Sequence, residues 1–209
     1  MPKISLKRQN KELAQPKKQL ELLANGIFEN GALPTFKSKL KVTNQFPLKP
    51  SELEILQLNL GYMCNQVCTH CHVDAGPDRK EIMTKHTLKQ CLEVLKSSGA
   101  HTLDLTGGAP EMNPHFKWFV EEASKIGVQD FVVRSNLTIL MAHKKYDNLP
   151  AFFKTHNIHV VSSMPHWTQG KTDQQRGKGV FNRSIEALKK LNRIGYGLPN
   201  SKLKLDLVY

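Results

Sequence analysis

The chain has 209 residues, of which 39% are apolar and 23% charged, a composition typical of an ordinary domain with a hydrophobic core. The formal net charge is +12, but residues 1–50 carry ten Lys or Arg against three acids, while the rest carries 20 against 15. A nearly balanced body behind a Lys-rich leader is not typical of a domain that binds a nucleic-acid backbone. We therefore do not expect nucleic acid to be the partner.

The sequence also constrains the compartment. No stretch approaches the ~20 consecutive apolar residues that a transmembrane helix needs, and the first residues lack the apolar segment of a secretory signal. Four cysteines are too few and too clustered for a disulfide framework. These features predict a cytoplasmic protein with no membrane partner.

The first 50 residues show only weak patterning, and we interpret them as a basic N-terminal extension preceding a second domain, residues 51–209. A short helix that ends near Gly26 is predicted there from five apolar residues. These are Leu20, Leu22, Leu23, Ile27 and Phe28.

From residue 54 onward, strand-like and helix-like patterns alternate along the chain. The expected strands are residues 54–60, 101–106, 131–135, 158–163 and 202–209. Four helices are expected between the strands. The first begins after the N-cap Thr84, and the second begins at Asn113-Pro114. The third covers residues 149–156, and the fourth ends near Gly195.

This alternation predicts βαβ units, a parallel sheet and right-handed crossovers, and thus an open or barrel-like α/β fold. The last strand has no helix after it, although sheets of this class are normally covered on both faces. We therefore expect a truncated chain whose missing part would follow Tyr209.

Three cysteines follow the first strand directly, in the order C-x₃-C-x₂-C. They are Cys64, Cys68 and Cys71. Three thiolates could bind zinc, with an open fourth position or with His70 or His72 as the fourth ligand. They could instead bind a [4Fe–4S] cluster and leave one iron open. Structural zinc sites more often repeat C-x₂-C twice, so the spacing favours the cluster. Cys91 lies on the apolar stripe of a helix, where a buried free thiol is the usual role.

A second motif, Thr106-Gly-Gly-Ala-Pro-Glu111, follows the second strand. Ligands of open α/β sheets bind beyond the carboxyl ends of the strands, so this motif and the cysteines should lie at one edge. Gly107 and Gly108 would allow close approach of the backbone, and Glu111 could hold an ammonium group. A tight turn alone would explain the paired glycines, but the combination with the cysteines is specific.

Together, the two motifs resemble the radical S-adenosylmethionine (SAM) superfamily, over about residues 54–209. The resemblance implies a partial (β/α)₆ TIM-like barrel, here incomplete with about five parallel strands. Six segments look more closely like the arsenosugar biosynthesis radical SAM family (ArsS-type). They are residues 56–61, 71–77, 106–111, 134–138, 163–166 and 172–180.

The resemblance implies a [4Fe–4S] cluster on the three cysteines, with SAM chelated to the fourth iron through its amino and carboxylate groups. Further SAM contacts are implied by position. His70 would lie against the adenine, and Arg134 would pair with the carboxylate. The amino group would be held by Gly107, Gly108 and Glu111. The ribose would be bound by Ser162 and Ser163. A surface salt bridge explains Arg134 equally well.

The implied activity is cleavage of SAM to a 5′-deoxyadenosyl radical that joins a trivalent methylated arsenical, with electrons from a donor such as flavodoxin or ferredoxin. Two alternatives stay open. One is a radical SAM enzyme that acts on a peptide or another small metabolite. The other is a non-catalytic metal-binding module whose basic leader contacts nucleic acid or an acidic partner.

Residues 168–179 follow the fourth strand with three glycines and three positive charges. We interpret this segment as a mobile lid over a polar or anionic substrate, with a solvated loop as the alternative. Arg176 within it, and His166 and Trp167 before it, are the candidate substrate contacts. Simple packing is the alternative role for the two aromatic residues.

Overall fold

The computed structural model describes residues 4–25, 34–49 and 51–208, and it divides into two compact units. Leu6–Glu52 forms the smaller unit, which contains η1 (Glu12–Ala14), α1 (Pro16–Asn25) and α2 (Phe36–Val42). Helix α1 confirms the predicted leader helix up to residue 25, while Ile27 and Phe28 lie outside the described residues. Helix α2 was not predicted, although Thr35 caps it by accepting a hydrogen bond from the Ser38 amide.

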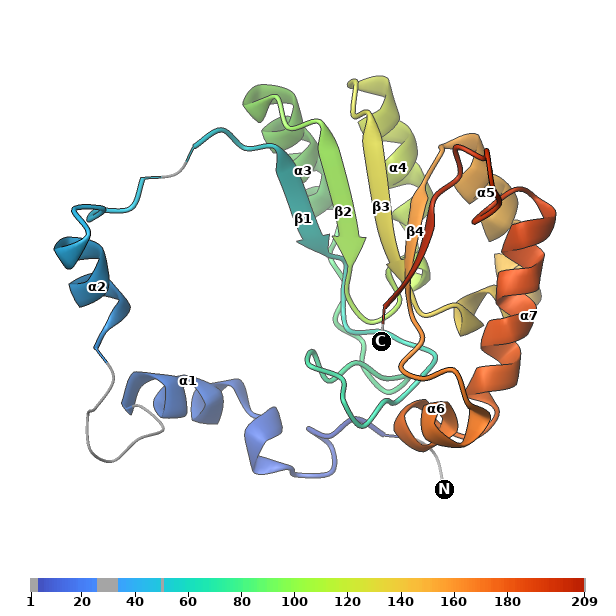
Figure 1. Cartoon of the computed structure of the whole chain (residues 1–209), viewed down its shortest axis with the longest axis horizontal. Helices are drawn as coiled ribbons and strands as arrows, with labels where there is room; N and C mark the ends of the chain where they lie inside the picture. Colours follow the sequence, from blue (N-terminus) through green and yellow to red (C-terminus); the bar gives the residue numbers. More distant parts are fainter. Residues whose placement is uncertain (1–3, 26–33, 50, 209) are drawn as a thin grey trace. The chain divides into compact units, whose positions relative to one another are not determined.

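The larger unit is built on one parallel sheet of five strands. They are β1 (Ile55–Asn59), β2 (Thr102–Thr106), β3 (Asp130–Ser135), β4 (His159–Ser163) and β5 (Leu205–Val208). Their order in the sheet is the order in the chain, and each strand pairs in parallel with the next (Figure 1). The predicted fold class, a partial TIM-like barrel with five parallel strands, is confirmed.

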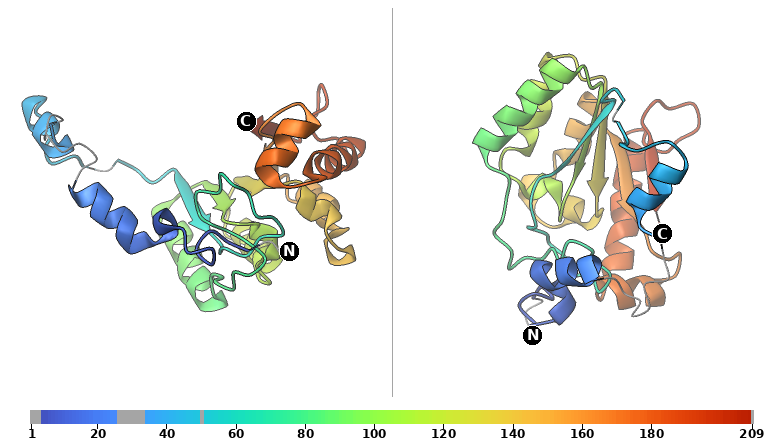
Figure 2. Two further views of the ribbon diagram at one scale, coloured as in Figure 1. Left: turned by 90° about the horizontal axis from the view of Figure 1, so that it is seen from below. Right: turned by 90° about the vertical axis from the view of Figure 1, so that its left-hand side faces the viewer.

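Crossover helices connect the strands and lie along the outer face of the curved sheet (Figure 2). The connecting elements are α3 (Lys85–Ser98), η2 (Pro110–Met112), α4 (Phe116–Lys125), η3 (Thr138–Met141), η4 (Lys144–Tyr146), α5 (Leu149–Thr155), α6 (Gln169–Arg176) and α7 (Val180–Arg193). Among the described residues, no helix combines the length and apolar character that crossing a membrane requires.

Helix α3 has the boundaries that its sequence signals predict. The Thr84 hydroxyl accepts a hydrogen bond from the Thr87 amide at 3.2 Å and caps the first turn. Gly99 ends the helix in the left-handed conformation, with φ of 72°. Leu88 and Leu95 are buried against the sheet, as the apolar spacing predicts.

Helix α4 begins later than predicted, at Phe116 instead of Pro114. Asn113 forms the turn that precedes this helix: its Oδ1 accepts from the His115 amide at 2.9 Å, and its carbonyl accepts from the Phe116 amide at 3.0 Å. Its Nδ2 donates to the carbonyls of Leu60 and Met83, at 3.0 and 2.9 Å, and so ties the start of α4 to both ends of the cysteine loop. We define the cysteine loop as residues 60–83.

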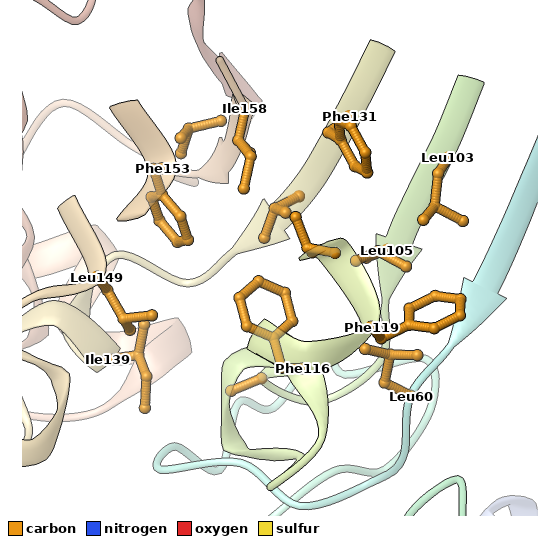
Figure 3. Packing of buried hydrophobic residues seen from close by; sticks show 14 of the residues in the cluster. Leu60, Leu103, Leu105, Phe116, Phe119, Phe131, Ile139, Leu149, Phe153 and Ile158 are labelled. Carbon is orange, nitrogen blue, oxygen red and sulfur yellow. The ribbon is translucent and has the colours of Figure 1, made fainter. Parts of the chain in front are cut away.

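The core lies between the sheet and these helices, where strand side chains of alternate positions meet aromatic residues of α4 and α5 (Figure 3). Leu103 and Leu105 of β2 face this layer and are fully buried, as are Phe116 and Phe119 of α4. Because strand side chains alternate in direction, Asp104 points to the opposite, inner face. The inner face and the carboxyl edge are therefore where polar groups gather.

The segment predicted to be a lid or a solvated loop is instead largely helical, since α6 occupies Gln169–Arg176. Asp173 on this helix caps α7: its carboxylate accepts hydrogen bonds from the amides of Gly179 and Phe181, at 2.7 and 2.9 Å. These bonds hold the glycine-containing turn between the two helices in place.

Candidate functional site

The cysteine loop lies beyond the carboxyl ends of the strands and is held by backbone hydrogen bonds (Figure 1). The Cys64 amide donates to the Gly76 carbonyl, and the Gly76 amide donates to the Tyr62 carbonyl. The Thr69 amide donates to the Gln175 carbonyl at the end of α6. The loop is thus fixed at its base and at its tip.

All three cysteines line one cavity of about 290 Å³ at this edge, a volume near the lower end of small-molecule sites. The other walls come from the ends of β2, β3, β4 and β5 and from α6. Its lining residues include Gln66, His70, His72, Thr106, Gly107, Gly108, Arg134, Ser135, Asn136, Ser163, Arg176 and Val208.

Gly107 and Gly108 bring the turn after β2 directly against the cysteine loop. The Gly108 amide donates to the Gly61 carbonyl at 2.9 Å. A Cβ at Gly108 would stand only 2.5 Å from the Met63 carbonyl oxygen and 3.0 Å from the Cys64 Cβ. No larger residue fits there without moving the loop, so the close approach expected from the glycine pair is present.

The three thiols differ in environment. Cys64 is buried, whereas Cys68 and Cys71 are half-buried. Burial raises the pKa of the Cys64 thiol to about 11, and the nearby Cys68 and Cys71 add to the rise. Binding of a metal centre at Cys64 therefore requires loss of a proton at neutral pH.

Among the residues that the structure describes, no three His, Cys, Asp or Glu side chains are close enough together to hold a single metal ion. Three sulfurs around one zinc would stand about 4 Å apart, given Zn–S bonds of about 2.3 Å in a tetrahedron. In a [4Fe–4S] cluster each thiolate binds a different iron, which spaces the sulfurs more widely.

Two predicted SAM contacts, His70 and Arg134, line the cavity. His70 lines it from the cysteine loop, and burial and the nearby Arg176 lower the pKa of its imidazole. Arg134 lines it from β3, where its Nε and Nη2 donate to the Asp104 carboxylate. The salt bridge that was the alternative explanation for Arg134 is therefore present, at 2.8 Å.

The two serines that end β4 do not share a face. Ser163 lines the cavity, but Ser162 is buried outside it, and its hydroxyl has no hydrogen-bond partner among the described residues. The physical reason is the alternation of side chains along a strand, which lets only one of two neighbours face the site. Of this pair, Ser163 alone is placed to contact a ligand there.

Glu111 is not among the residues that line this cavity. It lines a second cavity of about 310 Å³, together with Tyr146 and Leu149. Glu111 lies within the 3₁₀ turn η2, three residues after Gly108, and is buried there. The sequence motif predicts that this carboxyl group lies beside the cysteines, but in the structure it lines a different cavity.

The three candidate substrate contacts separate in the same way. Arg176 lines the cavity, is almost fully buried, and donates through Nη1 to the Ser163 carbonyl. Trp167 is 73% exposed and stacks on His166, with ring centroids 4.2 Å apart. Neither aromatic ring is among the residues that line the cavity.

Sequence reasoning gave no role to Ser135 and Asn136, which line the cavity just after β3. The Asn136 Nδ2 donates to Cys64 Sγ at 3.4 Å. The signal that could have found them was positional, because polar residues that end a parallel strand lie at the ligand-binding edge.

Comparison with known proteins places the chain in a family. The family model described as the radical SAM superfamily matches residues 58–202, well over half of the chain. The chain belongs to the radical SAM superfamily. This family implies a [4Fe–4S] cluster and SAM as cofactors, and its members are enzymes.

Curated relatives match at low identity. A probable GTP 3′,8-cyclase of Saccharolobus islandicus (strain M.14.25 / Kamchatka #1) is 25% identical over 146 residues, which cover 68% of this chain and 45% of that protein. The mycofactocin maturase MftC of Mycobacterium tuberculosis is 26% identical over 144 residues, 68% of this chain and 35% of that protein. This radical SAM chain thus spans less than half the length of these relatives.

Solved structures share the fold. A structure of anSMEcpe with bound AdoMet gives a TM-score of 0.60 at 18% identity, and it covers 75% of this chain and 43% of that one. SuiB of Streptococcus suis gives a TM-score of 0.58 at 15% identity, and it covers 91% of this chain and 43% of that one. At these identities the likeness shows the fold of the radical SAM core.

The site fits the implied cofactors in three respects. Three thiols line one cavity, and Gly107 and Gly108 line the same cavity without side chains. Arg176 adds a buried positive charge whose Nε has no partner among the described residues. A guanidinium there would stabilise an anionic cluster or the carboxylate of a bound amino acid.

Proposed function

We propose that this protein is a radical SAM enzyme whose Cys64, Cys68 and Cys71 ligate a [4Fe–4S] cluster. When bound, the reduced cluster supplies one electron to SAM and yields methionine and a 5′-deoxyadenosyl radical. The electron would come from a small redox protein such as flavodoxin or ferredoxin. The observation that carries the proposal is the shared cavity of the three cysteines with Gly107 and Gly108.

The chain's own residues position the ligand in this proposal. Gly107 and Gly108 offer bare backbone beside Cys64, and Ser163 and Arg134 face the cavity from neighbouring strands. His70 is only partly buried and lies at the cavity wall, where a neutral imidazole can stack on a flat base. Holding SAM in one orientation beside its electron donor is the main contribution that such residues make to the rate.

We further propose that the substrate is a trivalent methylated arsenical, and that its arsenic joins the 5′-deoxyadenosyl carbon, as in arsenosugar biosynthesis. To balance, the adduct would give one electron back to the oxidised cluster and lose a proton from its As–OH group, which leaves pentavalent arsenic in the product. The support is the resemblance of six segments to that family, several of which border the cavity. A peptide is the second candidate, since the fold neighbour SuiB has been solved bound to the precursor peptide SuiA. The buried Arg176 is compatible with a polar substrate of either kind.

The experiment begins with anaerobic reconstitution of the full chain. We expect about four irons per chain and release of 5′-deoxyadenosine with dithionite and SAM. Replacing Cys64, Cys68 or Cys71 by serine should abolish both. Cys91→Ser is the matched control. Cys91 lies on α3, packs against the hydrophobic core and does not line the cavity, so this variant should still bind iron and cleave SAM. Stoichiometric zinc without SAM binding would favour the metal-binding module.

The second arm compares 5′-deoxyadenosine release with and without dimethylated trivalent arsenic. The arsenic proposal predicts a new product that contains both arsenic and the deoxyadenosyl group. If SAM is cleaved but no arsenic-dependent product forms, the radical chemistry stands, and the substrate is a peptide or another metabolite.

A further inference from the structure

A strained turn follows β3 at the cavity edge. The Thr138 amide donates to the Asn136 carbonyl at 2.7 Å, which leaves Leu137 between them with φ of 63° and ψ of −50°. This is a γ-turn with a positive φ at its centre, a rare conformation that costs free energy in any residue except glycine. Leu137 is fully buried, so packing and the neighbouring side chains hold it there.

The turn directs the Asn136 amide toward the cysteine loop. Its Oδ1 accepts a hydrogen bond from the Ile139 backbone amide at 3.0 Å. A backbone N–H can only donate, so this bond fixes which end of the side-chain amide is oxygen. The Nδ2 must then face Cys64 Sγ, at 3.4 Å, and Asn65 Oδ1, at 2.7 Å.

The Thr138 hydroxyl closes the network from the other side of the turn. It donates to Asn136 Oδ1 at 3.1 Å and accepts from Asn65 Nδ2 at 2.9 Å and from Gln66 Nε2 at 2.7 Å. Gln66, Asn136 and Thr138 are all buried. Hydrogen bonds in such a dry network are stronger than in water, and they fix the cysteine loop against the turn that follows β3.

We propose that Asn136 is a positioning residue that donates a hydrogen bond to the Cys64 thiolate and thereby makes the bound cluster easier to reduce. This inference rests on the proposed function, because it requires Cys64 to be a cluster ligand. Reduction adds one negative charge to the cluster, and an N–H donor on a ligating sulfur stabilises that charge. Removing the donor should therefore make the reduction potential more negative.

The test compares two variants of the same network. Asn136→Leu removes the donor to sulfur, while Thr138→Val removes a buried hydroxyl that contacts Asn65, Gln66 and Asn136 but not sulfur. The measurement is a redox titration of the reconstituted full chain without SAM, followed by EPR, alongside iron content and circular dichroism. We expect Asn136→Leu to lower the equilibrium constant for reduction about tenfold, or about 59 mV for a one-electron couple. Thr138→Val should change it less than twofold.

Equal shifts in the two variants, or the wild-type potential in Asn136→Leu, would overturn the role of Asn136. If the Leu variant does not fold or load iron, Asn136→Asp is titrated instead. The titration is run at alkaline pH, where the buried carboxyl is ionised: Asp then keeps an acceptor for the Ile139 amide but has no donor, and its potential should also fall. A wild-type potential in the Asp variant overturns the inference. Failure of the wild-type protein to take up iron contradicts the proposed function itself, so the two failures are distinguishable.

Discussion

At the scale of single residues, Glu111 combines full burial with two carboxyl oxygens that have no hydrogen-bond partner among the described residues. Burial raises its pKa from 4.5 to about 7, and the nearby Ser135 offsets only part of the rise. The native state therefore binds more protons than the unfolded chain between these two pH values. It follows that the free energy of unfolding falls as the pH rises through this window, by up to roughly 3 kcal/mol.

Glu111→Gln should remove this dependence. We expect the variant to melt at a higher temperature than the wild-type apoprotein at pH 8, with the difference much smaller at pH 5. Thermal unfolding followed by circular dichroism at both pH values measures it. The control is Glu93→Gln, an exposed position on α3. The account is wrong if wild type and Glu111→Gln lose equal stability between pH 5 and pH 8.

At the scale of elements, the site depends on contact between the turn after β2 and the cysteine loop. The contact is close enough that a single methyl group at Gly108 would collide with Met63 and Ala75, at 2.5 and 2.9 Å. We expect Gly108→Ala to displace the loop, lower stability by about 1–3 kcal/mol and weaken iron binding. Gly170→Ala on α6 is the control, since a Cβ there meets nothing within 4 Å.

Denaturant unfolding and iron content after reconstitution measure both variants. A Gly108→Ala protein as stable and as iron-loaded as Gly170→Ala would show that the close contact does not hold the loop.

The regular elements of the larger unit could be predicted because their residues repeat with the period of a strand or a helix. The five strands and α3 therefore matched closely. The predicted start of α4 was two residues early, because Asn113 Oδ1 accepts from the His115 amide in a turn that precedes the helix. Its Nδ2 donates to the carbonyls of Leu60 and Met83, contacts that only the fold creates. Helix α6 was missed because its glycine and polar residues show no apolar stripe. It is held by hydrogen bonds to residues distant in sequence, such as the bond from the Thr69 amide to the Gln175 carbonyl.

Only part of the candidate site could be predicted from the sequence. The cysteines and the glycine pair form sequence motifs at strand ends, and they line one cavity. The facing of Glu111, Ser162 and Trp167 depends on local backbone direction, which a motif does not encode. Asn136 acquires its role only through the fold, because its partner Cys64 is 72 positions away.

At the scale of the whole molecule, the larger unit is a radical SAM core whose parallel strands all end at the cysteine loop (Figure 1). The Ser5 amide and hydroxyl bond to the Asp78 carboxylate, so a residue of the N-terminal segment also braces this loop. The three cysteines, the glycine pair and the buried Arg176 line one cavity at this edge. We propose that this edge holds a cluster with an iron open to SAM.

EPR spectroscopy of the reconstituted, dithionite-reduced full chain, recorded with and without SAM, tests this claim most directly. Binding of SAM to the open iron changes the electronic environment of the cluster. We predict the signal of a reduced [4Fe–4S] cluster whose g-values shift when SAM is added. The absence of a cluster signal, or a signal that SAM leaves unchanged, would contradict the account.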